Sequence, residues 1–314
     1  MSKPFALLCP GQGAQHPQMF DLARSDPATA ALLQEINARQ SIGITVDEAF
    51  ATSDRMFDNV IAQPLVVAAT LANWHAIRDA IPQPTVIAGY SIGEISAHAV
   101  SGGLDIFSAI QLAKERALAM QGCVQKDAPH CMLAVKGIPI RQIVEFVRQH
   151  RVYLAIVTSE SSCIIAGCRA DIYSSLPALQ QLGGRAMYVS ELPVKVASHT
   201  PMMAAASPAI EKLLMQTSFN ARATAVIAGI NGELVHTNDQ VRSSLLTQLT
   251  RPIQWSECMD SCNEAGIRFA LELGPGAALS AMLQARHPHI VCRSVADFRT
   301  ISGVIEWVFR QSNA

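Results

Sequence analysis

The sequence predicts an α/β fold, in which helices cover a parallel sheet and a small second domain is inserted into the chain. Three observations support this prediction. Short apolar runs typical of buried strands alternate with helical segments in the first and last parts of the chain, as in sheets covered on both faces. One of these strands turns abruptly into a helix at a serine. Residues 127–196 instead follow the order β-α-β-β-α-β, which is the ferredoxin-like arrangement.

The first predicted strand is the apolar run Phe5–Cys9. It leads into Pro10-Gly11-Gln12-Gly13, where a proline and two glycines predict a tight loop with exposed backbone. We expect a helix to begin at Pro64, because proline suits the first helical position, and to end near Ala80. A second buried strand is predicted over residues 85–88.

The stretch Gly89-Tyr90-Ser91-Ile92-Gly93 joins that second strand to a helix. It matches the nucleophile elbow, in which a serine hydroxyl projects from a sharp strand-to-helix turn. Glycine at positions 89 and 93 lets neighbouring backbone approach closely, and the helix N-terminus directs partial positive charge at the site above it. The same spacing also arises by chance in ordinary loops, so the preceding strand and following helix give it weight.

The next predicted helix, Ile106–Met120, carries Arg116 in its C-terminal half. Taken alone, this arginine is better explained by solvation or by the helix dipole than by ligand binding. The inserted domain is expected to contain helices at 140–149 and 170–182 and strands at 131–135, 153–157, 163–166 and 185–189.

His199 follows the inserted domain and precedes Thr200-Pro201, a good N-cap and first helical residue. We expect a helix from there to about residue 214. Its positive end disfavours protonation of the imidazole, which suits a neutral base. The remaining chain is predicted to alternate strands at 225–230, 268–273 and 290–295 with helices at 241–250, 253–265, 278–285 and 300–310.

The composition excludes several classes of function. The 314 residues carry a net charge of -1 and 16% charged residues, which argues against nucleic acid or an anionic membrane as partner. Half of the residues are apolar (50%), yet no uninterrupted apolar run reaches the roughly 18 residues of a membrane span. The first residues show no signal-peptide pattern, so we expect a soluble, cytoplasmic protein.

The eight cysteines are scattered through apolar segments of a chain too large to need disulfides, so buried thiols are expected. Cys258 and Cys262 share a helix face, and His287 and His289 form a second close pair. Neither pair has a C-x-x-C partner, so no metal site is predicted.

Three separated segments assemble one candidate site if their strands are neighbours. Acyl transfer requires a nucleophile, a base within hydrogen-bond reach and two donors for the developing oxyanion. Ser91 suits the nucleophile, His199 the base, and the backbone N–H groups of Gln12 and Ile92 the oxyanion hole. His98 is the alternative base, but it lies seven residues beyond the serine, roughly 10 Å along a helix.

Seven dispersed motifs keep their order and spacing over essentially the whole chain: Pro10-Gly11-Gln12-Gly13-Ala14-Gln15; Gln63-Pro64; Gly89-Tyr90-Ser91-Ile92-Gly93-Glu94; Arg116 with Met120-Gln121; Leu192-Pro193-Val194 with Ser198-His199; Gln248-Leu249 with Pro252-Ile253-Gln254-Trp255; and Glu272-Leu273-Gly274-Pro275-Gly276. Together they resemble the malonyl-CoA:acyl-carrier-protein transacylases. The whole set is much more specific than the serine motif alone.

The resemblance implies an α/β-hydrolase-like large domain, residues 1–126 and 197–314, with a ferredoxin-like small domain at 127–196. It implies a ping-pong reaction that moves malonyl from malonyl-CoA to an acyl carrier protein and needs no cofactor. The site residues and roles that it implies are Ser91 as nucleophile, His199 as base, Gln12 and Ile92 as oxyanion donors, Arg116 as partner of the malonyl carboxylate, Gln63 as a substrate-binding residue, and Gln248, whose backbone carbonyl orients the histidine.

Two segments depart from the family pattern. Tyr90 replaces the usual histidine before the nucleophile, and Thr158-Ser159-Glu160 replaces an Asn-Ser-Pro segment. Tyr90 and the stretch 95–105 are most similar to the transacylase (epsilon) subunit of malonate decarboxylase, whose other subunits would then be partners. A malonyl transacylase of fatty-acid synthesis is the alternative.

Two further classes of protein compete with a transacylase. A serine hydrolase, such as a thioesterase or lipase, needs a carboxylate on its histidine, and the candidates are Asp105, Asp127 and Asp171. A non-catalytic scaffold that docks a carrier would have no need of a serine, a histidine and an arginine in these motifs, so their joint presence argues against it.

Overall fold

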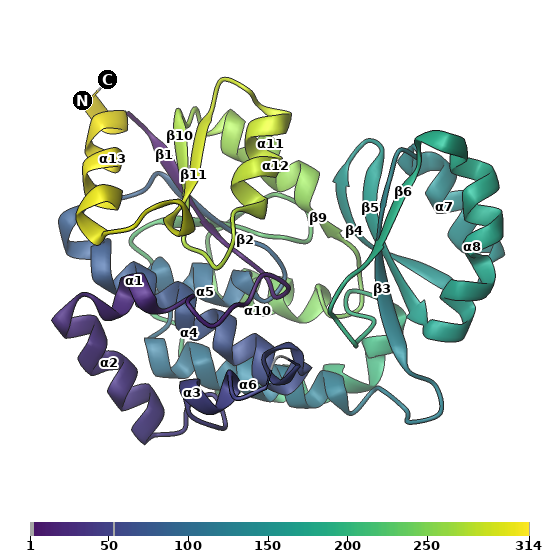
Figure 1. Cartoon of the computed structure of the whole chain (residues 1–314), viewed down its shortest axis with the longest axis horizontal. Coiled ribbons are helices and arrows are strands. Elements are labelled where there is room, and N and C mark those ends of the chain that lie inside the picture. The colour runs from purple at the N-terminus through teal and green to yellow at the C-terminus, as the bar shows by residue number, and fades with distance from the viewer. Residues whose placement is uncertain (1–2, 53, 314) are drawn as a thin grey trace.

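The computed structural model describes residues 3–52 and 54–313. Figure 1 shows a larger body with a sheet among many helices and a smaller body that carries a second sheet. One set of buried apolar side chains in the smaller sheet forms a cluster of its own, whereas others, such as Met132, Ile156 and Ala166, belong to the main cluster of the larger body. The two ends of the described chain lie together, where the Lys3 N–H donates to the Ser312 carbonyl at 2.9 Å. The predicted α/β class is confirmed.

The larger sheet has the strand order β11-β10-β1-β2-β7-β8, and every pair is parallel except β7 with β8. The central strand β1 is buried at every position, which explains its uninterrupted apolar sequence. The carboxyl ends of β1 and β2 are neighbours, so the loops that follow them meet. The strands of this sheet are β1 Phe5–Cys9, β2 Val86–Gly89, β7 Ala225–Ile227, β8 Leu234–Val235, β10 Phe269–Glu272 and β11 Val291–Ser294.

Helices surround this sheet, and in Figure 1 α4, α5 and α6 lie together on one side of it. The α-helices of the larger body are α1 Asp21–Arg24, α2 Pro27–Ala38, α3 Val46–Ala49, α4 Asn59–Ile77, α5 Gly93–Val100, α6 Ile106–Gln121, α9 Ser207–Gln216, α10 Asn238–Thr247, α11 Trp255–Glu264, α12 Ala278–Arg286 and α13 Ile301–Asn313. The 3₁₀ segments are η1 Arg55–Phe57, η2 Arg78–Ala80, η4 Pro201–Ala206 and η5 Val295–Asp297, with η3 Gly184–Ala186 in the smaller body.

The helix predicted to begin at Pro64 begins at Asn59 instead, so that prediction was wrong by more than one turn. Proline inside a helix normally costs stability because one backbone hydrogen bond is lost. Here Asn59, Ala62 and Gln63 are all buried, and tertiary packing outweighs that loss. Residues 59–80 form a segment long and apolar enough to cross a membrane. However, 78% of its apolar 18-residue window is buried within the protein, as in a core helix.

The smaller sheet has the order β6-β3-β5-β4-β9. Its first four strands are antiparallel neighbours in the ferredoxin-like order, and α7 and α8 complete the predicted β-α-β-β-α-β sequence. Strand β9 comes from the returning chain and pairs in parallel with β4, opposite Ile156 and Val157. The elements are β3 His130–Lys136, α7 Ile140–Gln149, β4 Val152–Ser159, β5 Ser162–Cys168, α8 Arg169–Gly183, β6 Tyr188–Glu191 and β9 Ile253–Gln254. The boundaries at 127 and 196 stay a prediction.

Two segments after the small domain differ from the predicted elements. The helix expected after Thr200 is split into η4 and α9, because Pro208 lies in the first turn of α9 and cannot donate to an earlier turn. The helix expected from Ile253 begins at Trp255, since Ile253 and Gln254 pair with the small sheet. The first difference depends on a second proline, and the second depends on a strand that is distant in sequence.

Candidate active site

Ser91 lies in the turn between β2 and α5, as the elbow pattern predicts. Its φ is +55°, a left-handed conformation that is uncommon for residues other than glycine and is frequent at functional sites. A Cβ at Gly89 would lie 2.4 Å from the Glu94 backbone, and one at Gly93 would lie 2.1 Å from the Cys9 carbonyl oxygen. The predicted need for glycine at both positions is therefore confirmed.

His199 contacts the serine directly, with 2.7 Å between its Nε2 and Ser91 Oγ. On its other side Nδ1 lies 2.5 Å from the backbone carbonyl oxygen of Gln248. A carbonyl can only accept, so Nδ1 must carry the proton and Nε2 is left free to accept from the serine hydroxyl. The structure thus brings Ser91, His199 and Gln248 together in the tautomer that a base requires.

His199 is held neutral, although the main cause is not the one predicted from the sequence. Burial and, to a smaller extent, the nearby positive charge of Arg116 lower the pKa of the imidazole to about 3, although the Gln248 carbonyl acts in the opposite direction. The residue also has a φ of +62°, a second left-handed non-glycine conformation at this site.

The two backbone N–H groups predicted for the oxyanion hole belong to the segments that follow β1 and β2. Ile92 is the N-cap of α5, so its N–H lies before the hydrogen-bonded part of the helix. Gln12 lies in the loop after β1, whose end is the register partner of the end of β2. Neither N–H has an acceptor within the part of the chain that the structure describes. The pair is available for an oxyanion, as donors in such sites must be.

Arg116 lies in the core on α6 with only 3% of its surface exposed. Its Nη1 donates to Gln63 Oε1 at 2.5 Å, and Gln63 in turn donates to Asn59 Oδ1 at 2.8 Å. Its Nη2 is buried and has no partner among residues 3–52 and 54–313. Burial lowers the pKa of the guanidinium to about 10, so it remains charged near neutral pH. A buried cation with an unpaired donor is costly unless an anion completes the site.

Sequence reasoning missed Glu94, which follows the elbow and is fully buried behind it. Its Oε2 accepts from the Gly229 N–H at 3.0 Å and from Gln248 Nε2 at 3.1 Å, and its Oε1 accepts from Ser244 Oγ at 2.5 Å. Burial raises the pKa of Glu94 to about 7, although the hydrogen bonds from Ser244 and Gly229 and the charge of Arg116 act in the opposite direction. The available signal was an acidic residue inside an otherwise apolar helical turn.

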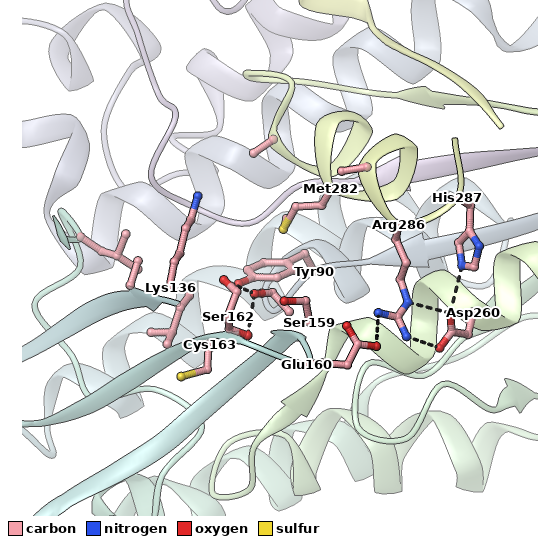
Figure 2. Close-up of a pocket in the computed structure, with 16 residues that line it drawn as sticks. Tyr90, Lys136, Ser159, Glu160, Ser162, Cys163, Asp260, Met282, Arg286 and His287 are labelled. Carbon is pink, nitrogen blue, oxygen red and sulfur yellow. Dashed lines mark hydrogen bonds and ion pairs between the residues drawn. The ribbon is translucent and has the colours of Figure 1, made fainter. Parts of the chain in front are cut away.

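A cavity of about 820 Å³ lies between the small sheet and α11 and α12, and Tyr90, the residue before Ser91, is part of its lining. Figure 2 shows Tyr90 in its middle, with Lys136 toward one end and a charged cluster at the other. In that cluster Arg286 makes two contacts with Asp260, at 2.6 and 2.7 Å, and a third with Glu160 at 2.9 Å. Both sequence departures, at Tyr90 and at residues 158–160, therefore line this cavity.

The alternative base and the hydrolase carboxylates lie elsewhere. His98 is buried against Phe219, with 6.4 Å between ring centroids, and neither of its ring nitrogens has a partner among the described residues. Asp105 caps α6 by accepting from the Ser108 N–H at 3.0 Å. Asp127 precedes β3, and Asp171 lies in the first turn of α8.

The candidate metal ligands serve other contacts. His287 Nε2 lies 2.9 Å from Asp260 Oδ1, and Cys258 Sγ donates to the Ala228 carbonyl at 3.5 Å. Within the described ranges no three His, Cys, Asp or Glu side chains are grouped to hold a metal ion. All eight cysteines are free thiols, and six of them are buried.

Comparisons with known sequences and with solved structures all find malonyl transacylases. The malonyl CoA-acyl carrier protein transacylase of Haemophilus influenzae is 25% identical over 313 residues, covering 98% of this chain and 99% of that protein. The crystallised enzyme of the same description from Coxiella burnetii has a TM-score of 0.90 at 23% identity and covers 99% of both chains, which shows the fold. A type II PKS acyl-carrier protein complex with its malonyl-transacylase matches with a TM-score of 0.87 at 25% identity, covering 96% of this chain and 99% of that one. Residues 6–298 match the family described as the acyl transferase domain, and the chain therefore belongs to that family.

Proposed function

We propose that this protein transfers malonyl groups from malonyl-CoA to the thiol of an acyl carrier protein. The observation that carries the proposal is that the same structure holds a serine hydrogen-bonded to a histidine and a buried arginine, Arg116, whose Nη2 has no partner among the described residues. The relatives named above, which are malonyl CoA-acyl carrier protein transacylases, support the same choice of substrate and acceptor. The eight free thiols are consistent with action in the reducing cytoplasm.

The proposed reaction has two half-reactions at Ser91. First, Nε2 of His199 takes the hydroxyl proton while Oγ bonds to the thioester carbonyl carbon, and the Gln12 and Ile92 N–H groups stabilise the oxyanion. The C–S bond then breaks, and the histidine returns the proton to the departing sulfur of CoA. In the second half, the carrier thiol gives its proton to His199 and its sulfur bonds to the ester carbonyl carbon. The ester C–O bond then breaks and His199 returns the proton to Ser91 Oγ, which leaves malonyl-carrier and the free hydroxyl.

The cavity beside Tyr90 is proposed to hold the arm that carries the thioester. It is lined by the residue before the nucleophile and by a mixture of apolar and polar side chains, as ligand sites commonly are. The known complex of an acyl-carrier protein with a malonyl-transacylase supports a carrier as the second partner.

The test is to mix the protein with malonyl-CoA, with and without an acyl carrier protein, and follow products by mass spectrometry. We expect a malonyl-protein adduct without the carrier and malonyl-carrier when it is present. Rapid hydrolysis of malonyl-CoA without any acceptor would instead identify a hydrolase. That outcome is not expected, because the partner of His199 Nδ1 is a carbonyl and not a carboxylate.

Replacing Arg116 by alanine should lower malonyl transfer by roughly two to three powers of ten. Breaking one side of a buried ion pair costs about 3–5 kcal/mol, because the substrate carboxylate loses its partner. Acetyl transfer should stay level or rise, since acetyl has no carboxylate. Arg116→Lys should rescue poorly, having charge without the planar fork. Equal losses with malonyl-CoA and acetyl-CoA would show that the arginine is structural.

A second candidate function is the transacylase subunit of malonate decarboxylase, which would act with the other subunits of that complex. Tyr90 favours it, because this departure from the transacylase pattern lies in the wall of the proposed arm site. Transfer rates should be compared for a carrier with phosphopantetheine and for one with the larger dephospho-CoA-derived group. We expect the ordinary carrier to be preferred if the protein serves fatty-acid synthesis, and the larger group if it serves malonate decarboxylation.

A further inference from the structure

The last turn of α10 is tied to a single carboxylate. Ser244 and Gln248 both lie in this turn or at its cap, and both donate to Glu94, at 2.5 and 3.1 Å. The Gly229 N–H donates to the same carboxylate at 3.0 Å, so three donors from two segments converge on it. Glu94 itself belongs to α5, the helix that begins directly after the nucleophile.

Gln248 has two roles in this arrangement. Its backbone carbonyl is the acceptor for His199 Nδ1, at 2.5 Å, while its side-chain amide reaches Glu94. Carbonyls at a helix C-terminus have no intrahelical partner, so the helix alone fixes their direction poorly. The amide–carboxylate contact supplies the missing constraint at the residue that aims the base.

We infer that Glu94 is a positioning residue for the base, holding His199 through Gln248 in the orientation needed to deprotonate Ser91. This role presupposes the acyl transfer proposed above. In serine hydrolases a carboxylate accepts a hydrogen bond directly from the histidine, whereas here the carboxylate acts on the histidine through Gln248. The contact also ties the base to α5, so nucleophile and base are aligned by the same helix.

Other charged or titratable groups near Glu94 do not replace it. Arg116 on α6 and Cys258 on α11 interact with it electrostatically. Neither side chain makes a hydrogen bond to Gln248 within the described part of the chain. Gln248 Oε1 has no partner there either, so the tie to Glu94 is its side chain's sole hydrogen bond among these residues.

The test measures single-turnover loading of the protein by malonyl-CoA, which separates the rate constant at saturation from the half-saturating concentration. Gln248→Ala keeps the backbone carbonyl but removes the amide, and Glu94→Ala removes the carboxylate. Each should lower the saturated rate constant about 10- to 100-fold, because a small misplacement of a catalytic group is costly in rate. The half-saturating malonyl-CoA concentration should not change, since neither side chain is proposed to touch the substrate.

Two further variants separate positioning from general stability. Glu94→Gln keeps an oxygen for Gln248 while Ser244 can accept from its amide, so it should restore most of the rate. Glu272→Ala is the matched control, because Glu272 is also fully buried, burial also raises its pKa to about 7, and it accepts from the Ser280 N–H at 2.8 Å, away from His199. It should lower the melting temperature without lowering the saturated rate constant.

The double variant Glu94→Ala/Gln248→Ala should be no slower than the slower single variant, because both changes break one chain of contacts. Two results would overturn the positioning role of Glu94 but leave the proposed function intact. One is a Gln248→Ala protein that loads at the wild-type rate; the other is a double variant in which the two single rate losses multiply. A wild-type protein that malonyl-CoA does not load would overturn the proposed function as well. If Glu94→Ala does not fold, Gln248→Ala decides the question.

Discussion

Replacing Ser91 by alanine should abolish the malonyl adduct that malonyl-CoA forms with the protein. The serine hydroxyl is the nearest nucleophile to the base, with Oγ 2.7 Å from His199 Nε2, and alanine leaves nothing to carry the acyl group. Removing the serine of a comparable serine–histidine site costs about six powers of ten in turnover. Intact-protein mass spectra after incubation with malonyl-CoA, followed by peptide mapping, measure the effect.

Ser96 provides the matched control for that experiment. It lies on α5, the helix that follows the nucleophile, is fully buried, and its Oγ has no partner among the described residues. The Ser96→Ala protein should be loaded as the wild type is. Adduct that persists in the Ser91→Ala protein would contradict covalent catalysis at the elbow and direct the search to another nucleophile.

Replacing His199 by alanine should slow acylation by about 10² to 10⁴, which is the usual contribution of a general base. Burial keeps the pKa of this histidine low, at about 3, so at neutral pH it is already in the form that accepts the serine proton. Binding of malonyl-CoA should persist, because Arg116 and Gln63 remain in place. Pre-steady-state loading, with binding measured by calorimetry on a Ser91→Ala background, separates the two effects.

The comparison variant is His98→Ala. It removes another buried histidine, which lies on α5. That ring packs against Phe219 and does not contact the serine, so acylation should be far faster than in the His199→Ala protein. If the His98 variant were the slower of the two, the base would have been assigned to the wrong residue.

Much of the fold follows from local pattern. The helix expected at 140–149 is observed over that range, and Phe5–Cys9 is a strand with the predicted bounds. In both cases hydrophobic periodicity and length agree, and no distant contact opposes them. Pro64 failed as a helix start because the preceding residues are held in the core by Arg116 and Met120, which lie more than fifty positions away. Strand β9 was missed because its partner belongs to the inserted domain.

The residues of the candidate site also differ in how far the sequence predicts them. Ser91 was predictable because glycines on both sides and a strand–helix change mark a turn that few other functions require. His199 was predicted from the helix start that follows it and from the need for a base beside the serine. Arg116 needed the family's motifs, since this residue has no local signature of substrate binding. Glu94 and the contact of Arg286 with Glu160 became visible only in three dimensions, because the partners of Glu94 and Arg286 in these contacts lie more than a hundred positions away in sequence.

The pairing of β9 with β4 also affects how this protein can be dissected. β4 is the last strand of the ferredoxin-like order, and its outer side is covered by residues 253 and 254 of the larger body. A fragment limited to residues 127–196 would leave that row of backbone N–H and C=O groups open. Open strand edges recruit other strands, so such a fragment is expected to self-associate. The insertion is continuous in sequence, yet the chain that follows it covers this edge of its sheet.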